Sequence, residues 1–190
     1  MKPPILYIIA GCNGAGKTTA SYNVLPNMLN CKEFVNADEI AKGLSPFASE
    51  TMAFQAGKLM LERIDELLGK KVTFAIETTL ATRSYVNLVT RAQAVGYQVS
   101  LLFFWLESPG FARRRVAERV SQGGHNIPSE VIERRYWLGL RNLFELFIPR
   151  VNYWALYDNN ARTSIIADAK RVWDSVKFNQ IKESCQNRNA

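Results

Sequence analysis

The sequence predicts an α/β domain in which a parallel β-sheet has helices on both faces. Short apolar runs alternate along the chain with segments of helical periodicity, which is the pattern of an α/β domain. The runs are continuously apolar rather than alternating, as expected when helices cover both faces of the sheet. The five expected strands are Ile5–Ala10, Glu33–Asn36, Val72–Ile76, Val99–Leu106 and Tyr153–Tyr157.

Helical segments separate these runs. Between Ser49 and Leu68, apolar residues recur at i, i+4 and i+7, which indicates one face of a helix. Ser108 and Pro109 are typical of a helix start, with a capping hydroxyl followed by proline at the first helical position, and Pro128 marks a second start. Helices are expected over 18–25, 49–68, 84–95, 109–122 and 129–147, followed later by a strand pair over 164–166 and 171–173 and a final helix.

The length and composition fit one globular domain over residues 1–190. Of the 190 residues, 47% are hydrophobic and 22% are charged, which excludes a disordered or collagen-like chain. The net charge of +7 points to an anionic partner. Three widely spaced cysteines argue against a disulfide scaffold or a zinc site, and the first apolar run is too short for a signal peptide or a membrane span. We therefore expect a soluble cytoplasmic protein with no membrane partner.

Residues 11–18 form a complete phosphate-binding loop of the pattern G-x-x-x-x-G-K-T. Its glycines let backbone amides turn toward phosphate oxygens, Lys17 reaches the terminal phosphates, and the Thr18 hydroxyl ligates Mg²⁺. A chance glycine-rich turn would lack the strand before it and the helix after it, both of which are expected here. The loop therefore predicts ATP and Mg²⁺ as cofactors. The expected nucleotide-binding residues are Asn13, Gly14, Ala15, Gly16, Lys17, Thr18 and Thr19.

Acidic residues follow two of the expected strands. Asp38 and Glu39 lie just beyond the second strand, and Glu77 closes the third. Functional groups in open α/β sheets gather at the carboxyl ends of strands, and phosphoryl transfer to a hydroxyl needs a carboxylate near the attacking oxygen. The alternatives are a helix N-cap for Asp38, a solvated Glu39, and a structural contact with helix ends for Glu77. A site role is favoured for Asp38, and for Glu77 if its side chain is buried.

An arginine-rich segment lies between the fourth and fifth expected strands, where a kinase carries its lid. Residues 111–150 hold eight arginines and four glutamates, a formal +4 of the net +7. Arginines that close over a triphosphate stabilise charge on the transferring group, and the Gly123-Gly124 pair suits a hinge, so a lid is expected over 109–150. The expected phosphate contacts are Arg119, Arg134 and Arg135, and the expected solvated residues are Arg113, Arg114 and Arg141.

Several short motifs occur in the chain in this order: the phosphate loop, Asn36-Ala37-Asp38, Ile76-Glu77-Thr78-Thr79, Gly123–Pro128 and Arg134-Arg135-Tyr136. In combination they resemble the zeta toxin-like family of P-loop kinases, over roughly residues 5–160. The resemblance implies a three-layer P-loop fold with the parallel strand order 2-3-1-4-5. It also implies transfer of phosphate to the 3′-hydroxyl of the sugar in UDP-N-acetylglucosamine, and an antitoxin protein as partner.

The resemblance implies roles for the matching residues. Asp38 would be the general base, Lys17 the phosphate clamp and Thr18 a Mg²⁺ ligand. Glu77 and Thr79 would line the substrate site, and Arg119 would be the first lid arginine.

Two positions depart from the family pattern. The second lid arginine falls on His125, which is otherwise a secondary site candidate, so Arg134 or Arg135 is the alternative for that role. The family's Gly-Thr-Gly-Arg run after the glutamate is replaced by residues 78–81, and Arg83 stands two positions further on as the substitute substrate contact.

The leading interpretation is an ATP-dependent phosphotransferase that moves the γ-phosphate to a hydroxyl of a small molecule, with a nucleotide sugar as one candidate. Two alternatives are a polynucleotide or RNA end kinase, suggested by the positive charge, and a non-catalytic ATP-binding regulatory module. No nucleic-acid-binding module is visible in the sequence, so a nucleic-acid partner is not expected. Asn159, after the fifth strand, is placed to touch the adenine.

Overall fold

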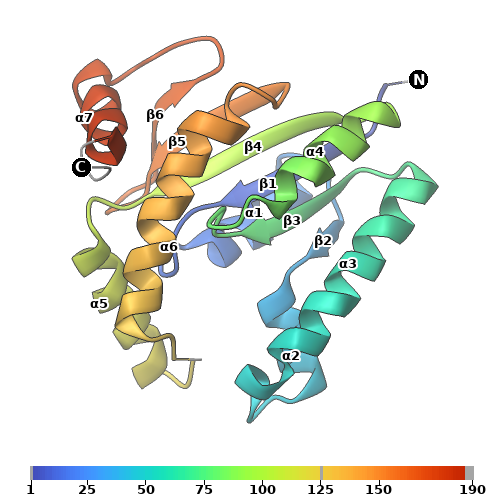
Figure 1. Cartoon of the computed structure of the whole chain (residues 1–190), viewed down its shortest axis with the longest axis horizontal. Helices are drawn as coiled ribbons and strands as arrows, with labels where there is room; N and C mark the ends of the chain where they lie inside the picture. Colours follow the sequence, from blue (N-terminus) through green and yellow to red (C-terminus); the bar gives the residue numbers. More distant parts are fainter. Residues whose placement is uncertain (1, 125, 187–190) are drawn as a thin grey trace.

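The computed structural model describes residues 2–124 and 126–186, and six strands of this part form one sheet (Figure 1). The strand order is β2-β3-β1-β4-β5-β6. The pairs among the first five strands are parallel, in the order that the resemblance implies, and the sixth adds an antiparallel edge strand beyond that order. The strands are β1 (Ile5–Ala10), β2 (Glu33–Val35), β3 (Phe74–Thr78), β4 (Gln98–Trp105), β5 (Tyr153–Asp158) and β6 (Ser164–Asp168).

Helices cover both faces of the sheet, as the sequence predicts. In Figure 1, α3 (Ala53–Lys70), α4 (Ser84–Ala94) and α6 (Ser129–Asn142) lie in front of the strands, and α1 (Lys17–Asn27) lies behind them. Right-handed crossovers produce this division, because the chain moves one way along the sheet from β1 to β2 and the opposite way afterwards. The remaining helical elements are α2 (Ala37–Leu44), the 3₁₀ turn η1 (Ser49–Met52), α5 (Pro109–Ser121), the π-helical turn η2 (Leu143–Phe147) and α7 (Ser175–Gln186).

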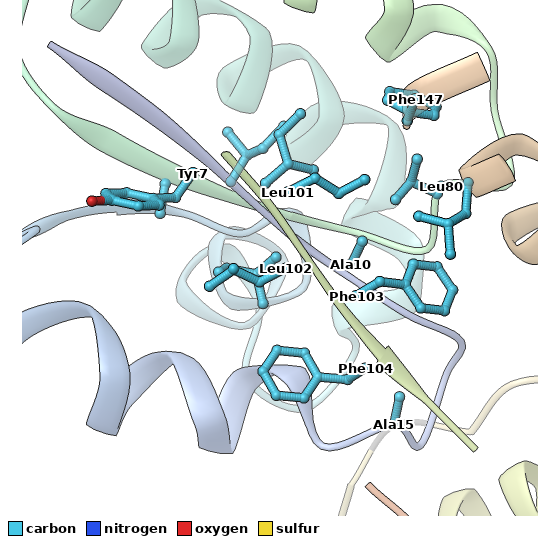
Figure 2. Packing of buried hydrophobic residues seen from close by; sticks show 14 of the residues in the cluster. Tyr7, Ala10, Ala15, Leu80, Leu101, Leu102, Phe103, Phe104 and Phe147 are labelled. Atoms are coloured by element: carbon cyan, nitrogen blue, oxygen red, sulfur yellow. The ribbon is translucent and has the colours of Figure 1, made fainter. Parts of the chain in front are cut away.

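Strand β4 shows why the apolar runs are continuous. Leu101 and Phe103 point toward the side of the sheet that holds Phe147, whereas Leu102 and Phe104 point toward the other side (Figure 2). All five side chains are buried. Burial of a side chain of this size contributes about 1.5–3 kcal/mol, so a strand covered on both faces gains stability from nearly every position.

Strands β2 and β3 differ from their expected bounds for local reasons, and the bounds of β4 and β5 move by one residue. Strand β3 begins two residues later than predicted, where Val72 is exposed, and it continues to Thr78, so that Glu77 lies inside the strand. Strand β2 ends at Val35 rather than Asn36, because the Asn36 side chain caps helix α2. In the expected pair after β5, residues 164–166 fall in β6, but the partner near Val172 forms only an isolated bridge with Ala167.

Two helices also differ from their predicted extent. The helix expected over 49–68 begins as the 3₁₀ turn η1 and continues in α3 to Lys70. The helix expected over 129–147 is α6 up to Asn142 and then becomes the π-helical turn η2. The Asn142 side chain is buried there and donates from Nδ2 to the Leu80 carbonyl at 2.7 Å, which fixes the end of α6 against the loop after β3.

The segment expected as a lid consists of two helices with different surroundings. Arg113 of α5 donates to Glu133 of α6 at 2.9 Å, which joins the pair. Helix α6 also buries Ile132, Tyr136 and Leu140 against the rest of the domain. The second half of the segment is therefore packed into the core, and α5 borders the phosphate loop.

Cys12, Cys31 and Cys185 carry free, buried thiols, and burial raises the pKa of each to about 11. All three are consequently protonated near neutral pH. Among the residues described, no helix combines the length and the apolar character that a membrane crossing requires.

Candidate active site

The phosphate loop lies in a narrow space between β1 and α1. Gly14 has φ +79°, and a Cβ at this position would lie 2.8 Å from the Ala112 carbonyl oxygen of α5. Gly16 has φ +76°, and a Cβ there would lie 2.8 Å from Asn159 Nδ2. Only glycine combines these backbone angles with such close approach. Gly14 and Gly16 therefore let the loop pack closely against neighbouring parts of the chain.

Glu77 accepts hydrogen bonds from two elements at the end of β3. Its Oε2 receives the Thr18 hydroxyl at 2.9 Å and Asn36 Nδ2 at 3.0 Å. Its Oε1 lies 3.6 Å from Lys17 Nζ, which also donates to the Cys12 carbonyl at 3.0 Å. The Lys17 and Glu77 side chains are only 7% and 9% exposed. A buried carboxylate needs such partners, and here the phosphate loop supplies two of them, Lys17 and Thr18, and Asn36 supplies the third.

Asn36 positions Asp38, the residue that the sequence predicts to be the general base. Its Oδ1 accepts the backbone N–H groups of Asp38 at 2.8 Å and Glu39 at 3.4 Å, so Asn36 is the N-cap of α2. Capping, the alternative considered for Asp38, is thus carried out by Asn36. Asp38 is exposed in the first turn of the helix. Glu39 pairs at 2.7 Å with Lys42, the solvated role considered for it.

Three cavities meet at Asp38. The nucleotide cavity, of about 350 Å³, contains the loop residues Asn13, Gly14, Gly16, Lys17, Thr18 and Thr19, together with Asp38, Glu77 and four residues of or near α5: Arg115, Glu118, Arg119 and Gln122. The threonine cavity, of about 220 Å³, shares Asn13, Lys17, Asp38 and Glu77 with it and adds Asn36, Ala37, Thr78, Thr79, Thr82, Tyr85 and Arg135. The outer cleft, of about 490 Å³, lies between the α2–α3 segment and the end of α5, and it also includes Asp38, Thr18 and Arg119.

The arginines divide between these cavities. Arg119 lines the nucleotide cavity together with Arg115, a residue that the sequence reasoning did not select. Arg115 donates to the Asn160 carbonyl at 2.9 Å, and its guanidinium lies 4.8 Å from the Phe111 ring centre. The two arginines are four residues apart on α5 and therefore lie on the same face of the helix. This spacing in the sequence could have identified Arg115 as a second arginine beside the phosphate loop. Arg135 lines the threonine cavity instead.

Other expected site residues lie in varied surroundings. Arg134 is exposed on α6, and Arg83 is exposed just before α4. Asn159 donates to the Ala15 carbonyl at 2.7 Å and accepts from the Thr163 hydroxyl, so its side chain braces the phosphate loop. His125 lies outside the described residues.

The family model for zeta toxins matches residues 1–166 of this chain. The chain belongs to the zeta toxin family. Membership of this family, together with the P-loop kinase fold around a complete phosphate loop, identifies the chain as an ATP-dependent kinase or phosphotransferase.

Known proteins resemble this zeta toxin family member over much of its length. An uncharacterized protein of Haemophilus influenzae is 25% identical over 127 residues, which are 66% of this chain and 88% of that protein. A chain of the PezAT chromosomal toxin–antitoxin system of Streptococcus pneumoniae has a TM-score of 0.68 at 17% identity, covering 99% of this chain and 86% of that one. A chain of the AvrRxo1-ORF1:ORF2 structure with ATP has a TM-score of 0.78 at 15% identity, covering 94% and 63%. At these identities the two structures show that the fold is shared.

Proposed function

We propose that this zeta toxin family member transfers the γ-phosphate of ATP to a hydroxyl group of a small-molecule acceptor, with Asp38 as the general base. The observation that carries the proposal is the position of Asp38, which lines both the nucleotide cavity and the threonine cavity. An acceptor in the second cavity would have its hydroxyl beside the carboxylate and facing the terminal phosphate.

The chemical step exchanges one phosphorus–oxygen bond for another. The acceptor oxygen attacks the γ-phosphorus, the bond from that phosphorus to the β–γ bridging oxygen breaks, and ADP leaves. The acceptor proton passes to the Asp38 carboxylate, and because Asp38 is exposed it returns the proton to solvent. A positioned base of this kind contributes about 10²–10⁴-fold to the rate.

Cationic side chains would bind the triphosphate. The backbone amides of the loop and the start of α1 favour the phosphates electrostatically. Lys17 would exchange its contact with Glu77 for the terminal phosphates. Arg115 and Arg119 approach from α5, and Arg119 would stabilise the charge that spreads over the transferring group.

Thr18 and Glu77 fit a Mg²⁺ ion. The Thr18 hydroxyl donates its hydrogen bond to Glu77, which leaves the lone pairs of its oxygen for a cation, and the carboxylate supplies nearby negative charge. Oxygen ligands of this kind, supplemented by phosphate oxygens, are those that Mg²⁺ prefers. When bound, the ion neutralises charge on the β- and γ-phosphates.

The acceptor and a protein partner complete the proposal. UDP-N-acetylglucosamine is the first acceptor to test, because the sequence motifs resemble enzymes that phosphorylate it. The likeness to PezAT, a toxin–antitoxin system, supports a protein partner of the antitoxin type for this chain. Co-purification of the tagged chain from its own cells would test that partner.

An acceptor screen tests the proposed reaction. The purified chain is incubated with γ-³²P-labelled ATP and Mg²⁺ in the presence of UDP-N-acetylglucosamine, nucleosides, a 5′-hydroxyl RNA oligonucleotide or a deproteinised cell extract. We expect ADP release that depends on a small-molecule acceptor, with the label on that acceptor. Label on RNA alone would favour an RNA end kinase, and ATP binding without acceptor-dependent ADP release would favour a regulatory module.

A further inference from the structure

Arg135 stands apart from the other arginines near the phosphate loop. Arg115 and Arg119 of α5 line the nucleotide cavity, whereas Arg135 of α6 lines the threonine cavity, which also includes Asp38. The α5 pair already supplies two positive charges to the triphosphate side. The position of Arg135 therefore adds positive charge on the side where the proposed acceptor would bind.

The guanidinium of Arg135 is only weakly engaged by the protein. It is half-buried, and it donates from Nη1 to Asn13 Oδ1 at 3.4 Å. Within the described part of the chain, no carboxylate lies within 4.0 Å of it, in contrast to Arg113, which pairs with Glu133 two residues earlier on the same helix. A partly desolvated guanidinium has five donors in a fixed plane and favours a carboxylate or phosphate that can accept two of them.

The end of β3 and the loop after it add threonine side chains to the lining of this cavity. Thr79 Oγ1 accepts the backbone N–H of Ala81 at 3.5 Å, which leaves its own proton available to donate. Thr82 lies on the same loop at the cavity edge. The loop is held in place by Leu80, which is fully buried with φ +59° and whose carbonyl accepts from Asn142.

One face of α6 carries Arg135 and also contacts the loop after β3. Arg135, Gly139 and Asn142 are separated by four and three residues and so lie on the same side of the helix. A Cβ at Gly139 would lie 2.4 Å from the Thr79 carbonyl oxygen, so the loop packs directly on the helix backbone. The backbone of Arg135 and the loop that carries Thr79 and Thr82 are thereby held next to each other by a rigid element.

We propose that the threonine cavity is a subsite for an anionic group of the acceptor, a carboxylate or a phosphate, bound by Arg135 and the Thr79 hydroxyl. This inference rests on the proposed phosphotransfer and narrows its substrate class to hydroxyl compounds that carry a negative charge. With the anion held at Arg135, the reactive hydroxyl of the acceptor extends to Asp38, which lines the same cavity.

The charge of the natural acceptor tests this subsite, whatever the identity of that acceptor. A deproteinised cell extract is separated on an anion exchanger into an unbound neutral fraction and an eluted anionic fraction, and each is incubated with the chain and γ-³²P-labelled ATP. We expect at least tenfold more labelled product from the anionic fraction. Pretreatment of that fraction with phosphatase and pyrophosphatase abolishes labelling if the group is a phosphate and leaves it unchanged if it is a carboxylate.

Variants of Arg135 connect the charge requirement to this residue. Arg135→Gln should lower labelling from the anionic fraction by about 10- to 100-fold, the usual loss for a hydrogen-bonded charged group, while the affinity for a fluorescent ATP analogue stays within about threefold. Arg135→Lys should recover part of the activity, because it restores charge without the bidentate geometry. Arg91→Gln removes the same charge from exposed α4 and should have no effect.

Two sets of results would overturn the subsite, and they differ from a failure of the proposed reaction. Label from the neutral fraction alone, or full labelling by Arg135→Gln, would show phosphotransfer without an anion subsite at Arg135. Absence of labelled product from both fractions would contradict the phosphotransfer itself and the subsite with it.

Discussion

The Thr18 hydroxyl donates to Glu77 Oε2 at 2.9 Å, which connects the end of the phosphate loop to the neighbouring strand. The parallel register of the sheet makes this contact possible, because Glu77 pairs with Ile9, two residues before the loop begins. Two residues far apart in the sequence thus meet at the carboxyl edge of the sheet, where ligands bind in open α/β folds.

The first prediction concerns the charge of Glu77. Glu77→Gln keeps the shape and a hydrogen-bond acceptor but removes the negative charge beside Thr18, so the proposed Mg²⁺ site should weaken by about 10–100-fold, the usual effect of losing such support. A Mg²⁺ titration of ATP-analogue binding and of phosphotransfer measures this shift. Glu62→Gln, which changes an exposed side chain of α3, is the matched control and should leave the Mg²⁺ titration unchanged. An unaltered Mg²⁺ dependence in Glu77→Gln would remove Glu77 from the site.

A second prediction separates the two contacts of Asn36. Asn36→Ser retains a capping oxygen for α2 but loses the Nδ2 donor to Glu77, whereas Asn36→Ala loses both. Both variants lose the donor to the buried Glu77, so the alanine variant should be less stable to urea than the serine variant by about 1 kcal/mol, because serine caps helices as well as asparagine. Both should transfer phosphate about tenfold more slowly, because each loses the hydrogen bond that orients the Glu77 carboxylate beside Thr18. A fully active serine variant would show that the link to Glu77 is dispensable.

The third prediction concerns the positive charge of α5. Arg119→Gln should lower the turnover number for phosphotransfer by about 10²-fold or more, since an arginine on the transferring phosphate acts chiefly in the transition state. Lys182→Gln on exposed α7 removes one positive charge far from the loop and should leave the turnover number unchanged. Steady-state kinetics of both variants decide the matter. Equal losses in the two would indicate a general effect of net charge.

A fourth prediction tests the packing of α6 on the loop after β3. Gly139→Ala places a methyl group 2.4 Å from the Thr79 carbonyl oxygen, so it should destabilise the fold by about 1–3 kcal/mol. The displaced loop should raise the KM for the acceptor more than the dissociation constant for ATP. Gly57→Ala in α3 has open space around it and should stabilise the helix by about 0.5–1 kcal/mol. Urea denaturation curves and acceptor kinetics of Gly139→Ala and Gly57→Ala measure these effects. An unchanged KM for the acceptor in Gly139→Ala would show that the packing of α6 on this loop does not shape the acceptor site.

Much of the fold follows from local pattern. The phosphate loop, the strand before it and the helix after it are all encoded within residues 5–27, and the continuous apolar runs correctly predict a sheet covered on both faces. The start of β3 could not be predicted from its apolar run, because Val72 is apolar but exposed. The α6 helix ends at Asn142, whose side chain bonds the carbonyl of Leu80, a residue distant in the sequence, and the π-helical turn follows there.

The site is predictable where its chemistry is local and not where it depends on contacts. Asp38 is predicted from its place after a strand, but the cap and bridge formed by Asn36 depend on the meeting of β2 and β3. Arg135 and Arg134 are adjacent in sequence, and only the rotation of α6 gives them different surroundings. The subsite at Arg135 therefore had to be inferred from the structure.

Asp38→Asn tests whether Asp38 is the general base of the proposed transfer. This variant keeps the size of the side chain and removes the proton acceptor, and Asp65→Asn, an exposed change on α3, is its control. The measurement is the rate of label transfer from ATP to the acceptor, alongside the dissociation constant of a fluorescent ATP analogue. We predict that transfer falls by about 10²–10⁴-fold while ATP affinity stays within about threefold. Transfer at the rate of the unmodified chain would show that Asp38 is not the base. A parallel loss of ATP affinity would show that it acts in nucleotide binding instead.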